Sequence, residues 1–514
     1  MTPPPACPPK VGPIGPKAGG GVTPFPFWNA LVSSLPPDSS WIVGGALRDR
    51  LLKRPTRDLD IATLHPPKQA ARRFAKKAGG VLFTLDEETR TYRVLISCRQ
   101  QTYQIDFAQV LGKNIGEDLQ RRDFTINAMA LPLAQPRLLA SGRFSRRLLD
   151  PLGGVRDAQK RSLRMTSPKV FPEDPLRLLR AFRIAAELDF RIEKNTLAAI
   201  EKHGPAIRKA AGERIREELL KLCGIGGSAG WFHQMDAVRL LTRIFPELES
   251  SRRCAMNYYP EGGVLGHSIR TVRCLEFLLH HLRQIYPKAW PSLRNYLDEP
   301  LSGYPRRNLL KLAALLHDIA KPATAKKIGG RLRFFGHDHL GSRMASQALK
   351  NLRFSNKEIE LVSSITRHHL RPGNLAANSI VTDRAAYRFF RDVGECGLGL
   401  LLVCWADHAS YAKKISIRPD AWTGNPKTDR HLEVVSLLLN RCFQKKEVVC
   451  PEKLVDGHDV IKTLNIPPGP QIRKILELIR EAQASGRIRT SRQALDFLLR
   501  QKDKFVTMSS DAPN

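Results

Sequence analysis

The chain has 514 residues, which is too long for one hydrophobic core, so we expect several domains. Its 83 Lys and Arg residues against 49 Asp and Glu give a net charge of +34, which favours RNA or DNA as a partner. The nine cysteines include no CxxC pair and no apolar run spans a membrane, so the sequence argues against a zinc ribbon, a disulfide framework and a membrane protein, and for a reducing cytoplasm.

The first 26 residues are rich in Pro and Gly and predict a disordered leader. A mixed α/β region follows, with a basic helix over 67–78 between two groups of strands. Short helices are expected at 27–35 and 46–52, and strands at 40–45, 58–63, 79–85, 92–97 and 102–110.

From about Pro168 the apolar residues recur with helical spacing, and this continues to the end of the chain. The polar stretch between His281 and Arg307 predicts an inserted surface loop, and residues 417–429 predict a linker. The fold class is therefore α+β, with a small mixed sheet followed by an all-helical remainder.

The stretch "TRDLDIAT" places Asp58 and Asp60 two residues apart on a predicted strand. Both carboxylates then point to one face, while Leu59 and Ile61 pack on the other. Two neighbouring carboxylates repel each other unless a cation lies between them, and hard oxygen ligands suit Mg²⁺.

Gly44 and Gly45 end a strand and begin a helix, which would present free backbone N–H groups to a phosphate, with Arg48 one turn into the helix. Asp106 in "YQIDFAQV" supplies a third carboxylate, with Asp118 as the alternative. This arrangement predicts a two-metal phosphoryl-transfer site.

"VGGALRDRLLKRPTRDLDIA" and "RRDFTINAMAL", followed in order by "LLDPLGGVRD", "FPEDPLRLLRAFRIA" and "GERIREELLKL", resemble the class II tRNA nucleotidyltransferase and poly(A) polymerase family. The resemblance covers roughly residues 40–225 and implies a polymerase-beta-like head. It further implies that Asp58, Asp60 and Asp106 are catalytic, with Asp58 and Asp60 holding Mg²⁺. The implied nucleotide contacts are Gly44, Gly45, Arg48, Arg122, Asp123, Asn127, Asp174, Arg177 and Arg180.

Asp174 and Arg177 are candidates for reading the incoming base without a template. At a spacing of i and i+3 on a helix they share a face, and an Asp acceptor beside an Arg donor matches the amino group and ring nitrogen of cytosine or adenine. The resemblance supports this use, because the family's EDxxR motif selects CTP and ATP. The same Asp, followed by Pro175, also fits a helix cap.

Most of the chain's 14 histidines fall between His267 and His408, including the pair His317 and Asp318 in "LAALLHDIAKP". The pattern resembles the HD metal-dependent phosphohydrolase domain. By that resemblance His267, His317, Asp318 and Asp407 bind a divalent transition metal, and His337 and His368 lie near it or bind a second ion. Mixed imidazole and carboxylate ligation would polarise a water for attack on a phosphoester.

Together these resemblances predict a head over 27–165, a helical nucleotide- and RNA-binding neck over 166–252 and an HD domain over 253–416. A tRNA-binding helical module over 417–504 and a tail over 505–514 complete the chain. We predict an enzyme that adds C, C and A from CTP and ATP to the 3′ end of tRNA.

Three alternatives within the family are CC-only addition, A-only addition and poly(A) synthesis. The acidic stretch "VLFTLDEETRTYRVLI" after the DxD strand disfavours poly(A) synthesis, because those polymerases usually carry a basic signature there. An alternative of another class is an HD phosphohydrolase whose front half only binds RNA.

Overall fold

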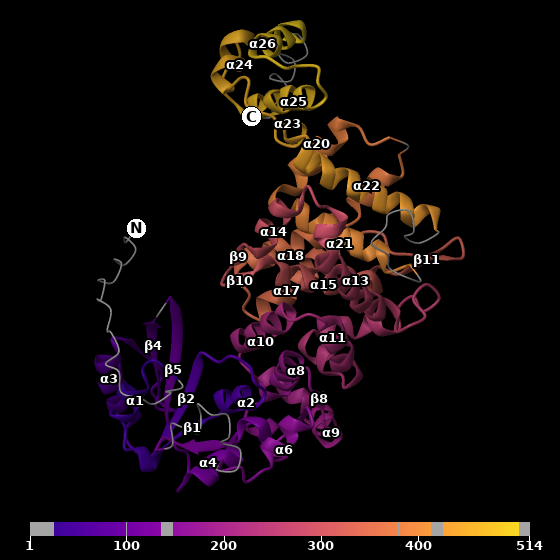
Figure 1. Cartoon of the computed structure of the whole chain (residues 1–514). Coiled ribbons are helices and arrows are strands. Elements are labelled where there is room, and N and C mark those ends of the chain that lie inside the picture. Colours follow the sequence, from indigo (N-terminus) through magenta and orange to yellow (C-terminus); the bar gives the residue numbers. More distant parts are fainter. Residues whose placement is uncertain (1–24, 99, 135–147, 379, 413–424, 503–514) are drawn as a thin grey trace. The chain divides into compact units, whose positions relative to one another are not determined.

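A computed structural model describes residues 25–98, 100–134, 148–378, 380–412 and 425–502 (Figure 1). Residues 1–24 of the predicted leader, and the predicted tail, lie outside the described residues. The chain divides into two compact units, residues 1–209 and 210–514, which are described one at a time. The boundary between the units falls inside the predicted neck.

The first unit contains a six-stranded sheet with the order β3-β4-β5-β2-β1-β6. Strands β2 and β5 run parallel, and the other neighbouring pairs are antiparallel. The strands are β1 (Ser40–Val43), β2 (Asp58–Thr63), β3 (Val81–Asp86), β4 (Thr91–Cys98), β5 (Gln101–Gln109) and β6 (Ala130–Pro132). The predicted mixed sheet is confirmed, and β6 is an addition that the sequence analysis did not include.

The helices of this part are α1 (Trp28–Val32), α2 (Gly45–Leu51), α3 (Pro67–Ala78) and α4 (Ile115–Arg121). Helix α3 has the bounds predicted for the basic helix and packs against β4 and β5, because Phe74 and its apolar neighbours share one face. Phe25 is only 4% exposed and belongs to the same core, so the packed structure begins inside the predicted leader.

The first unit ends in a helical region that follows the sheet. It comprises α6 (Gly154–Gln159), α7 (Val170–Glu173), α8 (Arg177–Leu188) and α9 (Lys194–His203), with short strands β7 (Ser162–Leu163) and β8 (Arg191–Ile192). Helix α8 turns one apolar face inward, burying Leu178, Phe182 and Ala185, and leaves Arg180 and Arg183 half-buried.

The second unit is almost entirely helical in its described residues. Its larger part comprises α10 (Gly212–Gly224), α11 (Ser228–Ala237), α12 (Leu240–Ile244), α13 (Gly263–Ile285), α14 (Trp290–Asp298), α15 (Arg306–Leu316), α16 (Lys321–Thr324), α17 (His337–Asn351), α18 (Asn356–His368), α19 (Arg371–Ala376), α20 (Asp383–Val393), α21 (Gly397–Ala409) and α22 (Pro426–Gln444). Short hairpins are formed by β9 (Pro300–Leu301) with β10 (Tyr304–Pro305), and by β11 (Lys326–Ile328) with β12 (Arg331–Arg333).

The prediction of an inserted surface loop between His281 and Arg307 is wrong. Helix α14 occupies its centre and buries Leu293 and Leu297, which are 0% and 2% exposed. Helix α22 likewise begins at Pro426, inside the expected linker, and packs against α21. In both places a polar, Pro-containing sequence also contains a few apolar residues at helical spacing, and these form the buried face of the helix.

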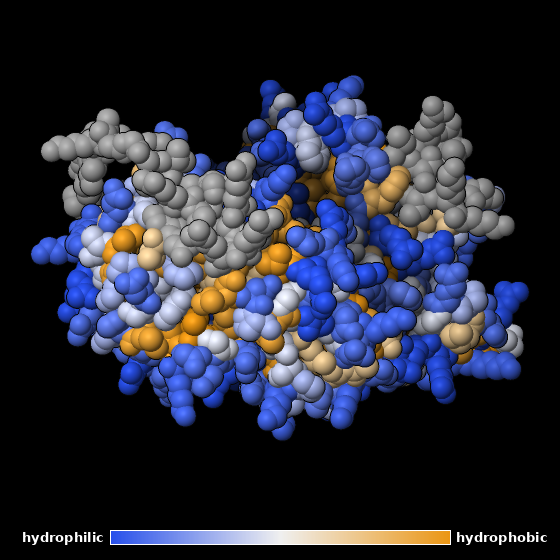
Figure 2. All heavy atoms as spheres, turned by 60° about the horizontal axis from the view of Figure 1, so that its bottom comes forward, coloured by the Kyte–Doolittle hydropathy of each residue, from blue (hydrophilic) through white to orange (hydrophobic). Residues whose placement is uncertain are grey.

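The chain ends in α23 (Lys446–Val449), α24 (Gly457–Leu464), α25 (Pro470–Ala484) and α26 (Ser491–Arg500). Helices α24 to α26 form a small core of their own around Val460, Ile475, Ile479 and Leu498. On the face shown in Figure 2, hydrophilic residues cover most of the described surface, with hydrophobic residues exposed between them. Among the described helices, none is both long and apolar enough to cross a membrane.

Candidate nucleotidyl-transfer site and metal centre

Asp58 and Asp60 lie on β2, where the alternation expected from the sequence is present. Leu59 and Ile61 are each 1% exposed and face the core. The parallel pairing of β2 with β5 places Asp60 directly beside Asp106. Three carboxylates from two strands are therefore gathered on one face of the sheet.

The carboxylates of this group destabilise one another when ionised. Burial is the largest cause and, together with the negative charges of Asp106 and Asp58, raises the pKa of Asp60 to about 6 against the opposing effect of Arg122. Burial and Asp106 also raise the pKa of Asp58. Two neighbouring carboxylates whose ionised forms are destabilised fit a bound cation. Their oxygen atoms are the ligands that Mg²⁺ prefers.

The two candidates for the third carboxylate have different partners. Arg93 donates two hydrogen bonds of 2.8 Å to the carboxylate of Asp106. Asp118 accepts from the backbone N–H of Leu111 at 3.0 Å and pairs with Arg122 at 3.0 Å. Asp118 thus closes the turn before α4, whereas Asp106 lies in register with Asp60.

The glycine turn joins β1 to α2 and lies against the carboxylates. Gly44 has φ +73°, a conformation that L side chains rarely adopt. A Cβ atom at Gly44 would lie 2.8 Å from Asp60 Oδ2 and 3.4 Å from Arg122 Nη1. The absence of a side chain at Gly44 is therefore what lets the turn approach Asp60.

A buried hydrogen-bonded chain connects α2, the "RRDFTINA" segment and α8. Arg48 Nη1 donates to Asn127 Oδ1 at 2.9 Å, and Asn127 Nδ2 donates to Asp123 Oδ1 at 3.0 Å. Arg180 donates to Asp123 Oδ2 at 2.9 Å. Although burial opposes it, Arg180 and these hydrogen bonds lower the pKa of Asp123 to about 2. Asp123 and Asn127 thus orient two arginines at the site.

These residues line a cavity of about 350 Å³. Its lining includes predicted residues from the glycine turn, β2, the "RRDFTINA" segment and α8, namely Gly44, Gly45, Arg48, Asp58, Asp60, Arg122, Asp123, Asn127 and Arg180. It also includes residues that the sequence analysis missed: Asp49, Thr56, Gln104, Arg183 and Glu187. Asp49, which pairs with Arg48 at 2.9 Å, could have been found as a charged neighbour of the glycine motif.

Asp174 and Arg177 are not both on one helix. Asp174 has an extended backbone between α7 and α8, and its Oδ1 accepts from the N–H of Leu176 at 3.1 Å. Arg177 begins α8 and donates to the carbonyl of Val170 at 3.3 Å. Neither Asp174 nor Arg177 is among the described residues that line the 350 Å³ cavity.

The second unit contains a buried group of histidines and aspartates, which we call the histidine cluster. His267, His317 and Asp407 form one set whose possible ligand atoms lie within 4.8 Å of one another, and Asp318, His337 and His369 form another. Asp318 connects the sets, because its oxygens lie 3.2 Å from His317 Nε2 and 3.4 Å from His337 Nε2. The members come from α13, the ends of α15 and α18, the start of α17, and α21.

The histidines are oriented for metal binding. Nδ1 of His317, His337 and His369 lies 2.6–2.8 Å from the carbonyl oxygens of Ala314, Phe334 and Thr366, so Nδ1 donates to the backbone and Nε2 faces the cluster. Nε2 of His267 and His317, Oδ1 of Asp318 and Oδ1 of Asp407 are buried without a hydrogen-bond partner in the described structure, while Oδ2 of Asp318 faces Lys321. Such unsatisfied atoms are costly, so the donor set fits a divalent cation.

Three family models match the chain in order. The poly A polymerase head domain matches residues 40–164, a probable RNA-binding site of polymerase A matches 189–251, and the HD domain matches 264–412. An A-adding tRNA nucleotidyltransferase of Deinococcus radiodurans is 30% identical over 474 residues, which is 90% of this chain and 96% of the relative. The chain belongs to the tRNA nucleotidyltransferase/poly(A) polymerase family.

A second relative supports the same family, and a solved structure supports the fold. A CC-adding tRNA nucleotidyltransferase of Geobacter sulfurreducens is 30% identical over 90% of this chain and 92% of its own length. The fold is similar to that of a Thermotoga maritima CCA-adding enzyme complexed with tRNA, with a TM-score of 0.57 and 18% identity over 90% of this chain and 91% of that one. The predicted fold class is confirmed.

In the HD domain of the protein, the prediction for one histidine is wrong. His369, not His368, lies in the histidine cluster, with its Nε2 3.1 Å from that of His337. His368 ends α18, and His369 follows it, so successive side chains point in different directions. His368 lines a separate cavity.

The sequence analysis also missed Lys321 and the aromatic residues of the HD domain. Lys321 Nζ lies 2.5 Å from Asp318 Oδ2 and donates to the hydroxyl of Tyr259 at 2.8 Å. The ring of Tyr259 stacks on His267 at a centroid distance of 4.6 Å. Position i+3 from Asp318 on a helical segment was the available signal for Lys321.

A cavity of about 690 Å³ opens beside the histidine cluster. Asp318, His337, His369 and Asp407 line it together with the cationic residues Lys321, Lys427 and Arg430. Positive charge beside a candidate metal site suits a phosphate-bearing substrate.

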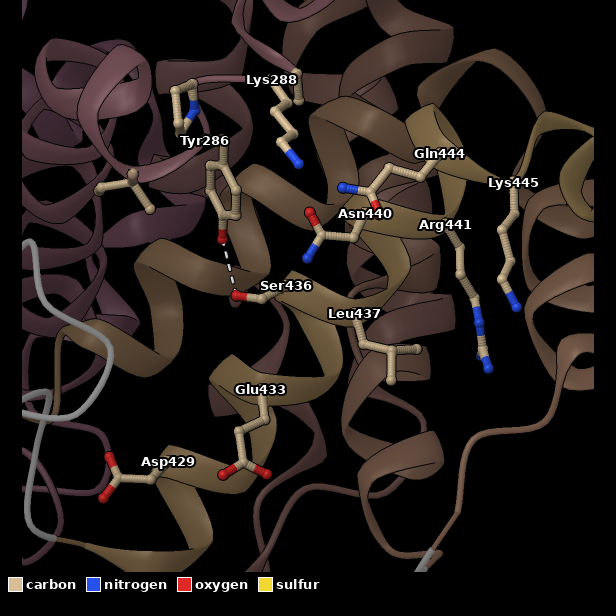
Figure 3. A pocket seen from close by; sticks show the side chains of 13 residues that line it. Tyr286, Lys288, Asp429, Glu433, Ser436, Leu437, Asn440, Arg441, Gln444 and Lys445 are labelled. Carbon is tan, nitrogen blue, oxygen red and sulfur yellow. Dashed lines mark hydrogen bonds between the residues drawn. The ribbon is translucent and has the colours of Figure 1, made fainter.

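Another cavity of the second unit, of about 730 Å³, lies between the end of α13 and α22 (Figure 3). The Tyr286 hydroxyl is hydrogen-bonded to Ser436 at 2.9 Å within it. Its lining contains Asp429 and Glu433 but no member of the histidine cluster. Of these two cavities, the 690 Å³ cavity is therefore the one that adjoins the candidate metal centre.

Proposed function

We propose that this protein adds C, C and A to the 3′ end of tRNA, using CTP and ATP. The observation that carries the proposal is the pairing of Asp58 and Asp60 with the glycine turn in a cavity that is also lined by four arginines. The relatives that span nearly the whole chain are named as tRNA nucleotidyltransferases, which supports tRNA as the acceptor.

In the proposed reaction, the tRNA 3′-hydroxyl oxygen bonds to the α-phosphorus of the nucleotide, and the bond to pyrophosphate breaks. Mg²⁺ held by Asp58 and Asp60 would neutralise charge on the reacting phosphate, with Asp106 as the proposed third carboxylate. The arginines Arg48, Arg122 and Arg180 provide positive charge for the triphosphate, and their carboxylate and amide partners orient them.

We further propose that Asp174 and Arg177 read the base. Both residues lie at the junction of α7 and α8, and α8 also carries Arg180, which lines the 350 Å³ cavity. A rotation of Asp174 away from its hydrogen bond with the N–H of Leu176 would present an acceptor beside the Arg177 donors. Comparable incorporation of UTP would contradict this assignment.

The test is extension of a tRNA that ends at the discriminator base, with CTP alone, ATP alone or both nucleotides. Addition of three nucleotides with both substrates is the expected result. No extension under any condition would overturn the proposal.

The same assay separates a second candidate function, in which the enzyme adds only part of the triplet. The names of the relatives favour this candidate, because one is A-adding and another is CC-adding. A product that stops after CC, or that forms only on tRNA already ending in CC, would establish it.

We propose that the HD domain is a metal-dependent phosphohydrolase that acts on a phosphoester of an RNA end. His267, His317, Asp318 and Asp407 would hold one divalent cation, and Asp318, His337 and His369 a second one. Such a cation would polarise water for attack on phosphorus. Lys321, Lys427 and Arg430 would bind the phosphate oxygens in the adjoining cavity.

The two activities are separated by Asp60→Ala and His317→Ala in the full chain. Asp60→Ala should abolish extension and retain metal-dependent phosphate release, and His317→Ala should do the reverse. Phosphate release without any extension by the wild type would favour the alternative in which the front half only binds RNA.

A further inference from the structure

The sequence motifs of the HD domain supply residues to two adjoining cavities. In "HDH", His337 belongs to the histidine cluster, whereas Asp338 and His339 line a cavity of about 650 Å³. In "RHH", His369 belongs to the cluster, whereas Arg367 and His368 line the second cavity. Asn374 lines both this cavity and the 690 Å³ cavity beside the cluster. We call the second cavity the arginine cavity.

Positive charge predominates in the arginine cavity. Its lining holds the four arginines Arg367, Arg371, Arg384 and Arg388, with Asp338 as its one carboxylate among the described residues. Guanidinium groups bind phosphate oxygens through paired N–H donors. The composition therefore fits a phosphate group.

Carboxylates outside the lining hold three of the arginines in place. Asp392 accepts from Arg371 at 2.6 Å, and Glu481 accepts from Arg384 at 2.8 Å and from Arg388 at 2.6 Å. Glu481 also accepts from Arg391 at 3.2 Å, and one carboxylate shared by three arginines leaves donors for a further anion.

Arg367 differs from the other three arginines. It is exposed and forms no ion pair within the described part of the chain. Its guanidinium is therefore available to a ligand, and its removal disrupts no packed network.

We propose that the arginine cavity binds the next phosphate of an RNA strand whose terminal phosphoester lies at the histidine cluster. The proposal rests on the phosphohydrolase function proposed above and names its substrate class. The HD domain then prefers an RNA end over a nucleoside monophosphate, because a second phosphate contributes binding.

Cytidine 3′-monophosphate and cytidine 3′,5′-bisphosphate provide the test, since they differ only in the second phosphate. Release of the 3′-phosphate by the full-length enzyme is measured with Mg²⁺, Mn²⁺, Co²⁺ or Ni²⁺. We expect kcat/KM for the bisphosphate to be about tenfold higher or more, as for one charged hydrogen-bonded contact.

Arg367→Gln should reduce this preference about three- to tenfold, through a higher KM for the bisphosphate, since one charged contact is lost. Arg294→Gln is the matched control, because Arg294 is 65% exposed on α14 and lies outside the arginine cavity. It should leave the preference unchanged. Equal kcat/KM for both nucleotides in the wild type, or full preference in Arg367→Gln, would overturn the proposal.

Failure of the phosphohydrolase function gives a different result, namely no phosphate release from either nucleotide with any metal. Binding of the bisphosphate to the metal-loaded wild type and Arg367→Gln, measured by calorimetry, then tests the cavity itself. Several-fold weaker binding by the variant supports the arginine cavity as a phosphate site, and equal binding overturns it.

Discussion

At the scale of single residues, the candidate nucleotidyl-transfer site depends on a backbone conformation and a grouping of negative charges that are each unfavourable in isolation. Gly44 has a left-handed conformation directly against Asp60, and Asp60 is a partly buried carboxylate beside two others. Such local costs are typical of functional sites, where surrounding packing maintains them.

Gly44→Ala is expected to destabilise the protein by about 1–3 kcal/mol, since a side chain is strained at this φ value and its Cβ would crowd Asp60 Oδ2. Extension should fall as the carboxylate is displaced. Gly45→Ala is the control, because its Cβ would meet only the end of the Arg48 side chain at 3.4 Å. Thermal unfolding and tRNA extension measure both effects, and equal behaviour of the two variants would contradict the argument.

Asp60→Asn should abolish extension yet stabilise the metal-free protein above about pH 6. The raised pKa of Asp60 means that its stabilising protonated form is fully present below pH 3.8 and is lost as pH rises through about 6. A shift to about 6 corresponds to roughly 2–3 kcal/mol.

Thermal unfolding in EDTA at pH 5 and pH 8 checks this. The advantage of the variant should be larger at pH 8, and added Mg²⁺ should raise the melting temperature of the wild type more than that of the variant. A variant less stable than the wild type at pH 8 would show that the carboxylate is not strained.

At the scale of elements, strand pairing decides which carboxylates meet. Asp106 lies on β5 in register with Asp60 on β2, whereas Asp118 lies on α4 and binds Leu111 and Arg122. The element that carries each aspartate thus suggests a different role for it.

Asp106→Asn is therefore expected to lower the rate of extension about 100-fold or more, as loss of a charge-stabilising group does. Asp118→Asn retains an acceptor for Leu111 and should act mainly through Arg122, with a loss of about tenfold or less. Single-turnover extension with saturating CTP distinguishes them. The reverse order would assign the third carboxylate to Asp118.

At the scale of the whole molecule, the net charge of +34 dominates. Basic side chains that contact backbone phosphates release counterions when RNA binds. We expect tRNA affinity to fall by about two orders of magnitude or more between roughly 50 and 200 mM salt, as for several phosphate contacts. A filter-binding titration across this range is the measurement, and affinity independent of salt would contradict it.

The sequence by itself determined the class of each part of the chain. Period-two alternation predicted β2 with its two carboxylates, because Leu59 and Ile61 must be buried. Helical periodicity predicted α3 and the helical second unit. The order of the motifs predicted the family, since several motifs in one order are more specific than any one alone.

Only the tertiary structure decided which residues meet. The rotation of the chain at the end of α18 places His369 in the histidine cluster and His368 in the arginine cavity. The local sequence alone does not show which of the two adjacent histidines faces the cluster. Asp174 lies before α8 and accepts from the N–H of Leu176 instead of sharing a helix face with Arg177, and the parallel pairing of β2 with β5 places Asp106 beside Asp60. These outcomes depend on packing between segments far apart in sequence, whereas periodicity and motif order are local properties of the chain.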